Sequence, residues 1–314
     1  MSNAVTVAID LGFGDVKSIF DGSPPRKTPT VIVPKPANMN MAGIVGVNSE
    51  FSMPTYRVGG VEYLVGHAAL EYVKQSGANT GIQRRIHWLI DHLPLFSAHA
   101  CHGEDTSNTK MVVGIPLADY HNHCSRVKDV LSPYYSNVEV HAQGIGILVD
   151  HLSRVSGKQS GVVLDVGYNT AIVVQFIDNK PVGTGCRQYD QQGVSEAAIL
   201  LVQKIEALCG AQIKLPEANA YITKSGGLFL FGGKSYELSQ LVAESITEYA
   251  KQLIDSILIF HEKTISRSGQ LVLAGGGAYL ISDYLKKSVD VPVIISPEPE
   301  FANVRGYYIL GTRG

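Results

Sequence analysis

At 314 residues, the chain is longer than a single hydrophobic core usually serves, so we expect two lobes, each with its own core. Hydrophobic residues make up 45% of the sequence and charged residues 17%, which excludes disorder as the overall state. The formal net charge of −2 excludes a general attraction to nucleic acid or anionic lipid, so neither is expected as a direct partner. The sequence shows neither a membrane-spanning run nor a signal peptide, which predicts a cytoplasmic protein.

Short strands and helices alternate in the first half of the chain. A strand over residues 5–9 turns at Gly12 to Gly14 and returns over residues 17–20. Six prolines between residues 23 and 61 exclude a long helix there and indicate a small inserted subdomain. The other elements predicted are a helix at 67–76, a strand at 111–115, a helix at 119–131, a strand at 138–141 and a helix ending at 152.

The second half starts with a turn-rich segment at 157–161, which we interpret as a hinge between the lobes. A hairpin follows, with strands at 162–164 and 171–177 on either side of a turn at Asp165. A helix at 195–208 is predicted to end at Gly210 as its C-cap glycine. The remaining predictions are a hairpin at 226–234, an amphipathic helix at 239–264 and a strand at 271–274.

Two segments about half a chain apart share one pattern. Val7-Ala8-Ile9-Asp10-Leu11-Gly12-Phe13-Gly14 aligns with Val162-Val163-Leu164-Asp165-Val166-Gly167-Tyr168-Asn169, an offset of 165 − 10 = 155 positions. A single copy is typical of an ordinary structural turn, because Asp and Gly are common turn residues. Two copies in register indicate a paired phosphate-binding device. Its carboxylates would face Mg²⁺, and exposed backbone N–H groups would receive phosphate oxygens.

Three consecutive glycines, Gly275, Gly276 and Gly277, follow the predicted strand at 271–274. One interpretation is a tight crossing of two backbone segments, and the other is a flat surface for a nucleotide base or ribose. The helix that starts near Ala278 would suit a phosphate or ribose at its N-terminus. Both interpretations stay open from the sequence.

Two other patterns suggest sites that we do not expect. The segment from Gly227 to Ser235 resembles a P-loop, but it has five residues where that motif requires four, so we predict a hairpin edge. His121, His123 and Cys124 suggest a metal cluster, yet they lie on a predicted helix, where neighbours one and two residues apart do not share a face. We therefore expect no zinc site.

In these motifs the chain resembles the actin-like ATPases, and ParM-type plasmid-segregation actins and archaeal actin-like relatives are the nearest in pattern. Five segments carry the resemblance in family order: the first phosphate loop (8–14), the first connecting helix (142–146), the second phosphate loop (164–170), the adenosine loop (272–278) and the closing helix (301–307). The resemblance implies an α/β, two-lobed actin-like ATPase fold. Each lobe would have a mixed five-stranded-type sheet flanked by helices, with a nucleotide cleft between the lobes.

The resemblance also implies domain limits. Lobe I would comprise residues 1–158 and 304–314, with a smaller subdomain at 23–92. Lobe II would comprise residues 159–303, with a smaller subdomain at 211–265.

Site residues follow from the same resemblance. Asp10 would hold Mg²⁺ through water, and Asp165 would share that role or polarise the attacking water, which Gln143 would orient. The division of catalytic roles between Gln143 and Asp165 stays open, as does the choice between ATP and GTP. Lys204 and Glu206 either contact the nucleoside or are exposed helix charges. The residues expected to bind nucleotide are Asp10, Gly12, Phe13, Gly14, Lys17, Gly167, Tyr168, Asn169, Thr170, Lys204, Glu206, Gly275, Gly276 and Gly277.

The function implied is that of an ATP- and Mg²⁺-binding protein that polymerises with ATP and disassembles after hydrolysis. Its partners would be further copies of itself and a DNA-binding adaptor protein, in plasmid segregation or another cytoskeletal role. Two alternatives stay open, because fold does not select function. One is a sugar-type kinase of a small metabolite, and the other is a nucleotide-binding scaffold without turnover.

Overall fold

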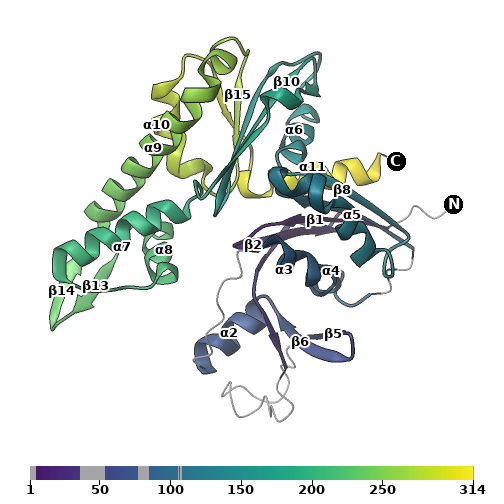
Figure 1. The fold of residues 1–314 in the computed structure, drawn as a ribbon, viewed down its shortest axis with the longest axis horizontal. Helices are drawn as coiled ribbons and strands as arrows, with labels where there is room; N and C mark the ends of the chain where they lie inside the picture. The colour runs from purple at the N-terminus through teal and green to yellow at the C-terminus, as the bar shows by residue number, and fades with distance from the viewer. Residues whose placement is uncertain (1–4, 36–53, 77–84, 105, 107, 314) are drawn as a thin grey trace. The chain divides into compact units, whose positions relative to one another are not determined.

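The structure is a computed structural model that describes residues 5–35, 54–76, 85–104, 106 and 108–313 (Figure 1). The chain divides into two compact units, Met1–Val149 with Asn303–Gly314, and Asp150–Ala302. It changes unit within helix α6 (Ile145–Leu152) and at the start of helix α11 (Ala302–Thr312). The segment at 157–161, interpreted above as a hinge, therefore belongs to the second unit.

A five-stranded mixed sheet with the order β3-β2-β1-β7-β8 forms the base of the first unit. β1 pairs antiparallel with β2 and parallel with β7, and β7 pairs parallel with β8. Both β1 and β7 are buried along nearly their whole length, as expected for apolar strands in the middle of a sheet that is covered on both faces. The strands are β1 (Val5–Leu11), β2 (Asp15–Phe20), β3 (Arg26–Pro29), β7 (Thr109–Ile115) and β8 (Asn137–Ala142).

A second, three-stranded sheet and several helices complete the described part of the first unit. The small sheet has the order β4-β6-β5 and leads directly into α2, which covers the predicted residues 67–76. Residues 36–53 and 77–84 of the predicted smaller subdomain lie outside the described residues. These elements are β4 (Ile32–Pro34), β5 (Thr55–Val58), β6 (Val61–Val65), α2 (His67–Ser76), α3 (Ile86–Asp91), α4 (Leu93–Ala100) and α5 (Tyr120–Leu131).

The second unit contains a six-stranded mixed sheet with the order β11-β10-β9-β15-β16, in which β12 also pairs with β10. β9 pairs antiparallel with β10 and parallel with β15, and β15 pairs parallel with β16. Every strand predicted for this half is present. The strands are β9 (Gly161–Val166), β10 (Thr170–Ile177), β11 (Lys180–Pro181), β12 (Arg187–Asp190), β15 (Leu271–Ala274) and β16 (Val293–Ile295).

The two large sheets therefore repeat one arrangement. In each, the strand that carries the aspartate lies between an antiparallel hairpin partner and a parallel neighbour, and a second parallel strand follows that neighbour. β12 occupies the place of β3, since each pairs antiparallel with the hairpin partner. The internal repeat inferred from the two aspartate-glycine segments thus extends to whole sheets, and the prediction of a mixed five-stranded-type sheet in each lobe is confirmed.

Helices of the second unit pack around its largest member, α9, which contacts α7, α8 and α10 (Figure 1). Buried side chains recur along one face of α9, so tertiary packing supports its length. Gly210 ends α7 in the left-handed conformation, as predicted. The elements are α7 (Ser195–Cys209), α8 (Leu215–Thr223), β13 (Leu228–Phe231), β14 (Lys234–Glu237), α9 (Ser239–Ser266) and α10 (Ala278–Ser288).

In the described part of the chain, no helix is both long and apolar enough to cross a membrane. No group of three or more histidine, cysteine, aspartate or glutamate residues in that part could hold a metal ion.

In the first unit, α6 and α11 cross at two glycines. A Cβ added to Gly306 would overlap the carbonyl oxygen of Gly146, and one added to Gly146 would lie 2.8 Å from the Cα of Asn303. The two backbones therefore touch with no room for a methyl group.

We expect Gly306→Ala to destabilise the protein by about 1–3 kcal/mol, because overpacking of the crossing outweighs the gain in helix propensity of up to about 1 kcal/mol. Thermal unfolding should show a lower Tm. Gly183→Ala is the control, because nothing lies within 4 Å of a Cβ at that position. An unchanged Tm for Gly306→Ala would show that α6 and α11 separate at little cost.

Candidate functional site

The first acidic turn lies at the carboxyl end of β1. Asp10 is 5% exposed and pairs in register with Lys17 of β2. Gln143, the residue after β8, donates a hydrogen bond from Nε2 to Asp10 Oδ1 over 2.8 Å and to the Leu11 carbonyl over 3.3 Å. Because β1, β7 and β8 run parallel, their carboxyl ends share one edge of the sheet. That edge brings together Asp10 and Gln143, two predicted site residues far apart in the sequence.

Burial raises the pKa of Asp10, and the Lys17 ammonium and the hydrogen bond from Gln143 lower it by less. The carboxylate therefore carries its charge at a cost in folding free energy. Carboxylate oxygens are the ligands that Mg²⁺ prefers, and a bound cation would offset this cost. The donor set around Asp10 thus suits a divalent cation.

Contacts on both sides hold the turn after β1. A Cβ on Gly12 would lie 2.5 Å from the Asp15 carbonyl oxygen, so this position requires glycine. Thr30 donates from Oγ1 to the Gly12 carbonyl (2.9 Å) and from its backbone N–H to the Gly14 carbonyl (3.0 Å). Thr30 was missed from the sequence, because nothing in its own segment marks it as part of this turn.

The second acidic turn closes in the same way at the carboxyl end of β9. Asp165 is 7% exposed, and the Gly167 N–H donates to the Thr170 carbonyl over 2.9 Å. The loop before α7 then supports the turn, because Val194 N–H donates to the Gly167 carbonyl (3.0 Å) and Ser195 N–H to the Tyr168 carbonyl (2.9 Å). These supporting residues were also missed. The feature of the sequence that could have indicated them is Gly193, just before the predicted helix.

Buried polar atoms beside the second turn lack partners. Asn169 Oδ1 and Ser195 Oγ are buried, and neither has a hydrogen-bond partner among the described residues. Buried polar atoms in native proteins are nearly always paired with protein, water or ligand. This pair therefore marks a place where a polar ligand or its bound water fits.

The glycines after β15 serve two different purposes. Gly275 has a φ of +88°, and a Cβ there would overlap Asp165 Oδ1 and the Val166 carbonyl oxygen. Gly277 donates from its N–H to the same carbonyl over 2.9 Å, and its Cβ would lie 2.6 Å from Val166 Cγ1. Gly276 has no atom within 4 Å of a Cβ position. The outer glycines thus satisfy a tight crossing, whereas Gly276 borders open space.

Side chains distinguish the two turns despite their common backbone. The residue paired in register with Asp165 is Ile172, at the position that Lys17 holds opposite Asp10. The first turn therefore has a cation beside its carboxylate and the second has an apolar side chain.

Lys204 and Glu206, predicted either to contact the nucleoside or to be exposed charges, have different surroundings. Lys204 forms an ion pair with Glu248, with Nζ 3.1 Å from Oε2. The same lysine lines a cavity of about 490 Å³ beside α9. Glu206 is exposed and accepts a hydrogen bond from Gln212 over 3.2 Å. Residues two apart on a helix face different directions, so only Lys204 borders this cavity.

Asn303, on α11, supports the backbone next to Gln143. Gly144, whose φ is +88°, donates from its N–H to Asn303 Oδ1 over 3.0 Å. Tyr307 donates from its hydroxyl to the same oxygen and to the Ala142 carbonyl, each over 3.3 Å. α11 therefore fixes the turn that carries Gln143, a role the sequence did not reveal for Asn303.

We expect Asp10→Asn to raise the Tm of the nucleotide-free protein at pH 7. The folded-state pKa of Asp10 lies above its unfolded value, so ionisation in the fold costs stability, and this cost grows as pH rises through the folded pKa. Asparagine keeps an acceptor for Gln143 without the charge. The gain should shrink towards zero as pH falls below about 3, where Asp10 is protonated in both states. Asp15→Asn, in the same turn, is the control, and a Tm at pH 7 no higher than wild type would contradict this reasoning.

A family model described as the N-terminal domain of actin-like proteins matches residues 8–146, and one described as the C-terminal part of the archaeal actin homologue MreB-like matches residues 163–287. A search of curated proteins found no match.

Several solved structures resemble the whole chain. The archaeal actin homologue Ta0583 is 20% identical, with a TM-score of 0.80 over 99% of this chain and 100% of that chain. A ParM filament from Clostridium botulinum is 19% identical, with a TM-score of 0.76 over 99% and 100%. The MamK double helical filament is 15% identical, with a TM-score of 0.73 over 98% and 96%. At such identities these likenesses establish the fold alone. The two family models, which together match most of the chain, show that it belongs to the actin-like ATPase family.

Proposed function

We propose that this protein binds ATP with Mg²⁺, polymerises into dynamic filaments and disassembles after hydrolysis. One observation carries the proposal. In each of the two large sheets, a buried aspartate lies at the carboxyl end of the central strand, and a glycine turn follows it. The carboxyl ends of strands are where open α/β sheets bind ligands. The homologue Ta0583 has also been solved in complex with ADP, at 18% identity, which supports a nucleotide as the ligand.

In this proposal each turn takes part in nucleotide binding. Asp10 and Asp165 would hold Mg²⁺, largely through water, and the bound ion would neutralise charge on the phosphates. Backbone N–H groups of the turns at Gly12 to Gly14 and Gly167 to Thr170 would receive phosphate oxygens, apart from the Gly167 N–H, which donates to the Thr170 carbonyl, and Lys17 would add a positive charge. Gly276, which borders open space, leaves room for the nucleoside.

Gln143 is the residue that we propose to orient the attacking water. Its Nε2 is engaged with Asp10, so Oε1 is the atom that accepts a hydrogen bond from the water. Asn303 and Tyr307 restrict the backbone next to Gln143, which keeps the amide in one direction. Asp165 either shares the metal or polarises the water.

Filament formation is the part of the proposal that depends most on relatives. Two structures of similar fold are described as filaments, of ParM and of MamK. Contacts between different faces of identical subunits produce an open filament when the rotation does not close. Plasmid segregation is the role we favour, in the cytoplasm and through a DNA-binding adaptor, because the formal charge of −2 gives little direct attraction to DNA.

The decisive experiment follows light scattering and phosphate release together after ATP and Mg²⁺ are added. Wild-type protein should scatter light and then lose the signal as phosphate appears. Gln143→Ala should still assemble but release phosphate roughly a hundredfold more slowly, because the water is no longer oriented. Its filaments should therefore persist. Gln75→Ala, an exposed glutamine on α2, is the matched control and should behave as wild type.

Other outcomes would select the alternatives. A protein that stays monomeric with ATP yet phosphorylates a small metabolite is a kinase. A protein that binds ATP without phosphate release, and whose behaviour does not change in Gln143→Ala, is a nucleotide-binding scaffold. Electron microscopy with ATP, with ADP and with a non-hydrolysable analogue tests assembly independently.

A further inference from the structure

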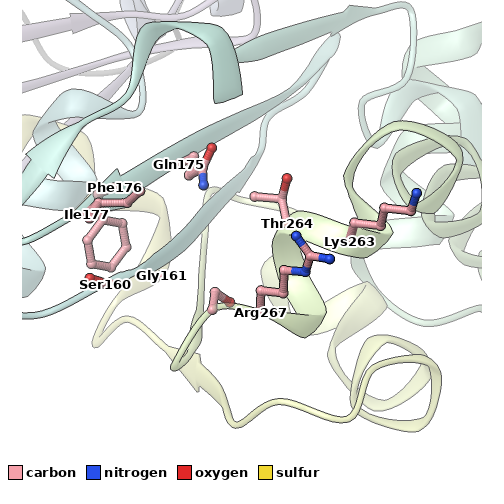
Figure 2. A pocket seen from close by; sticks show the side chains of 9 residues that line it. Ser160, Gly161, Gln175, Phe176, Ile177, Lys263, Thr264 and Arg267 are labelled. Atoms are coloured by element: carbon pink, nitrogen blue, oxygen red, sulfur yellow. The ribbon is translucent and has the colours of Figure 1, made fainter.

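A cavity of about 330 Å³ lies within the second unit, apart from the acidic turn. One wall is the C-terminal end of α9, and the other is the end of β10 with the start of β9 (Figure 2). Gly161 opens β9 at this cavity, whereas Asp165 lies four residues further along the strand, roughly 13 Å away. None of the residues proposed above for nucleotide binding lines it.

Two exposed cations line the cavity, Lys263 in the last turn of α9 and Arg267 directly after its end. Lys263 and Arg267 are four residues apart, so they are neighbours on the helix surface, and like charges at this spacing repel. No acidic residue lines the cavity, and no described residue forms an ion pair with either cation. Their position near a helix C-terminus, where cations are favoured, explains why α9 tolerates them. It does not explain why both border a hollow.

The other walls add neutral donors and an apolar surface. Ser160 Oγ accepts a hydrogen bond from the Asp178 N–H over 3.1 Å, so its own proton can be donated elsewhere. Thr264 lies between the two cations in the sequence and lines the same wall (Figure 2). Opposite them, Phe176 is fully buried and Ile177 is 49% exposed. The cavity thus offers positive charge, hydroxyl donors and one apolar side.

We propose that this cavity binds a small phosphomonoester, with its phosphate between Lys263 and Arg267. The guanidinium group of arginine matches the geometry of phosphate with two parallel hydrogen bonds, and lysine adds a compact charge. A dianion placed there removes the repulsion between the two cations. Ile177, which is 49% exposed, would contact the organic part. The volume lies near the lower end of the range for small-molecule sites, about 300–1,000 Å³.

Isothermal titration calorimetry of the full chain tests this proposal, with glycerol phosphate and inorganic phosphate as separate probes. ADP and Mg²⁺ are kept at saturating concentration, so that phosphate does not report from the proposed nucleotide residues. The double variant Lys263→Gln/Arg267→Gln should bind both probes at least roughly tenfold more weakly, because two charge-assisted hydrogen bonds are lost.

Lys286→Gln/Lys287→Gln is the matched control. It removes two exposed charges from the C-terminal turn of α10 in the same unit, so it should bind as wild type does. The charge-conserving variant Lys263→Arg should also retain binding. Circular dichroism of each variant confirms that the fold is kept.

Tighter binding of glycerol phosphate than of inorganic phosphate would support the apolar contact as well as the charge pair. The proposal is overturned if wild-type protein binds neither probe, or if the pocket variant and the control variant bind equally. The comparison of the two charge-matched variants holds even if ADP does not bind, so failure of the proposed function is distinguishable from failure of this site.

Discussion

The structure depends on one constraint, a carboxylate buried at the carboxyl end of a central strand. In both units a small residue lies opposite it on the neighbouring parallel strand: Gly114 opposite Asp10, and Ala274 opposite Asp165. A Cβ on Gly114 would overlap the ring of Tyr307, so α11 fills the space that the missing side chain leaves. The packing of α11 thus depends on a glycine more than 190 positions earlier in the chain.

The burial of Asp10 lowers the stability of the folded protein, and a binding role would explain why the charge is there. Desolvation raises its pKa, and the fold compensates in part with Lys17 and Gln143, which lower it. A buried side chain that served stability alone would be apolar. Ile172 is an example, since it pairs with Asp165 at the position where Lys17 pairs with Asp10. A costly charge supported by two polar partners is typical of a binding site rather than of a structural core.

Local patterns in the sequence predicted local structure well. Helix α2 and strand β15 have the predicted limits, because a glycine precedes the first and an apolar run opening into glycines defines the second. Long-range relations were less accessible. The hydrogen bonds from Gln143 to Asp10 and from Gly144 to Asn303 join residues 133 and 159 positions apart, and they exist only once the parallel strands are aligned. The different surroundings of Lys204 and Glu206 are also long-range, since Lys204 pairs with Glu248 of α9.

The two turns share a backbone arrangement but differ in the side chains around it, and these differences suit different tasks. In each turn the glycine, Gly12 or Gly167, lies close to the carbonyl oxygen of the residue three positions later. The two turns therefore share one backbone geometry. Around them, the first turn has gained Lys17, Gln143 and Thr30, whereas the second has the orphaned Asn169 Oδ1 and the close glycine Gly275. The first therefore has the charged and amide groups that chemistry on a phosphate needs. The second has unfilled hydrogen-bonding capacity, which a bound ligand would complete.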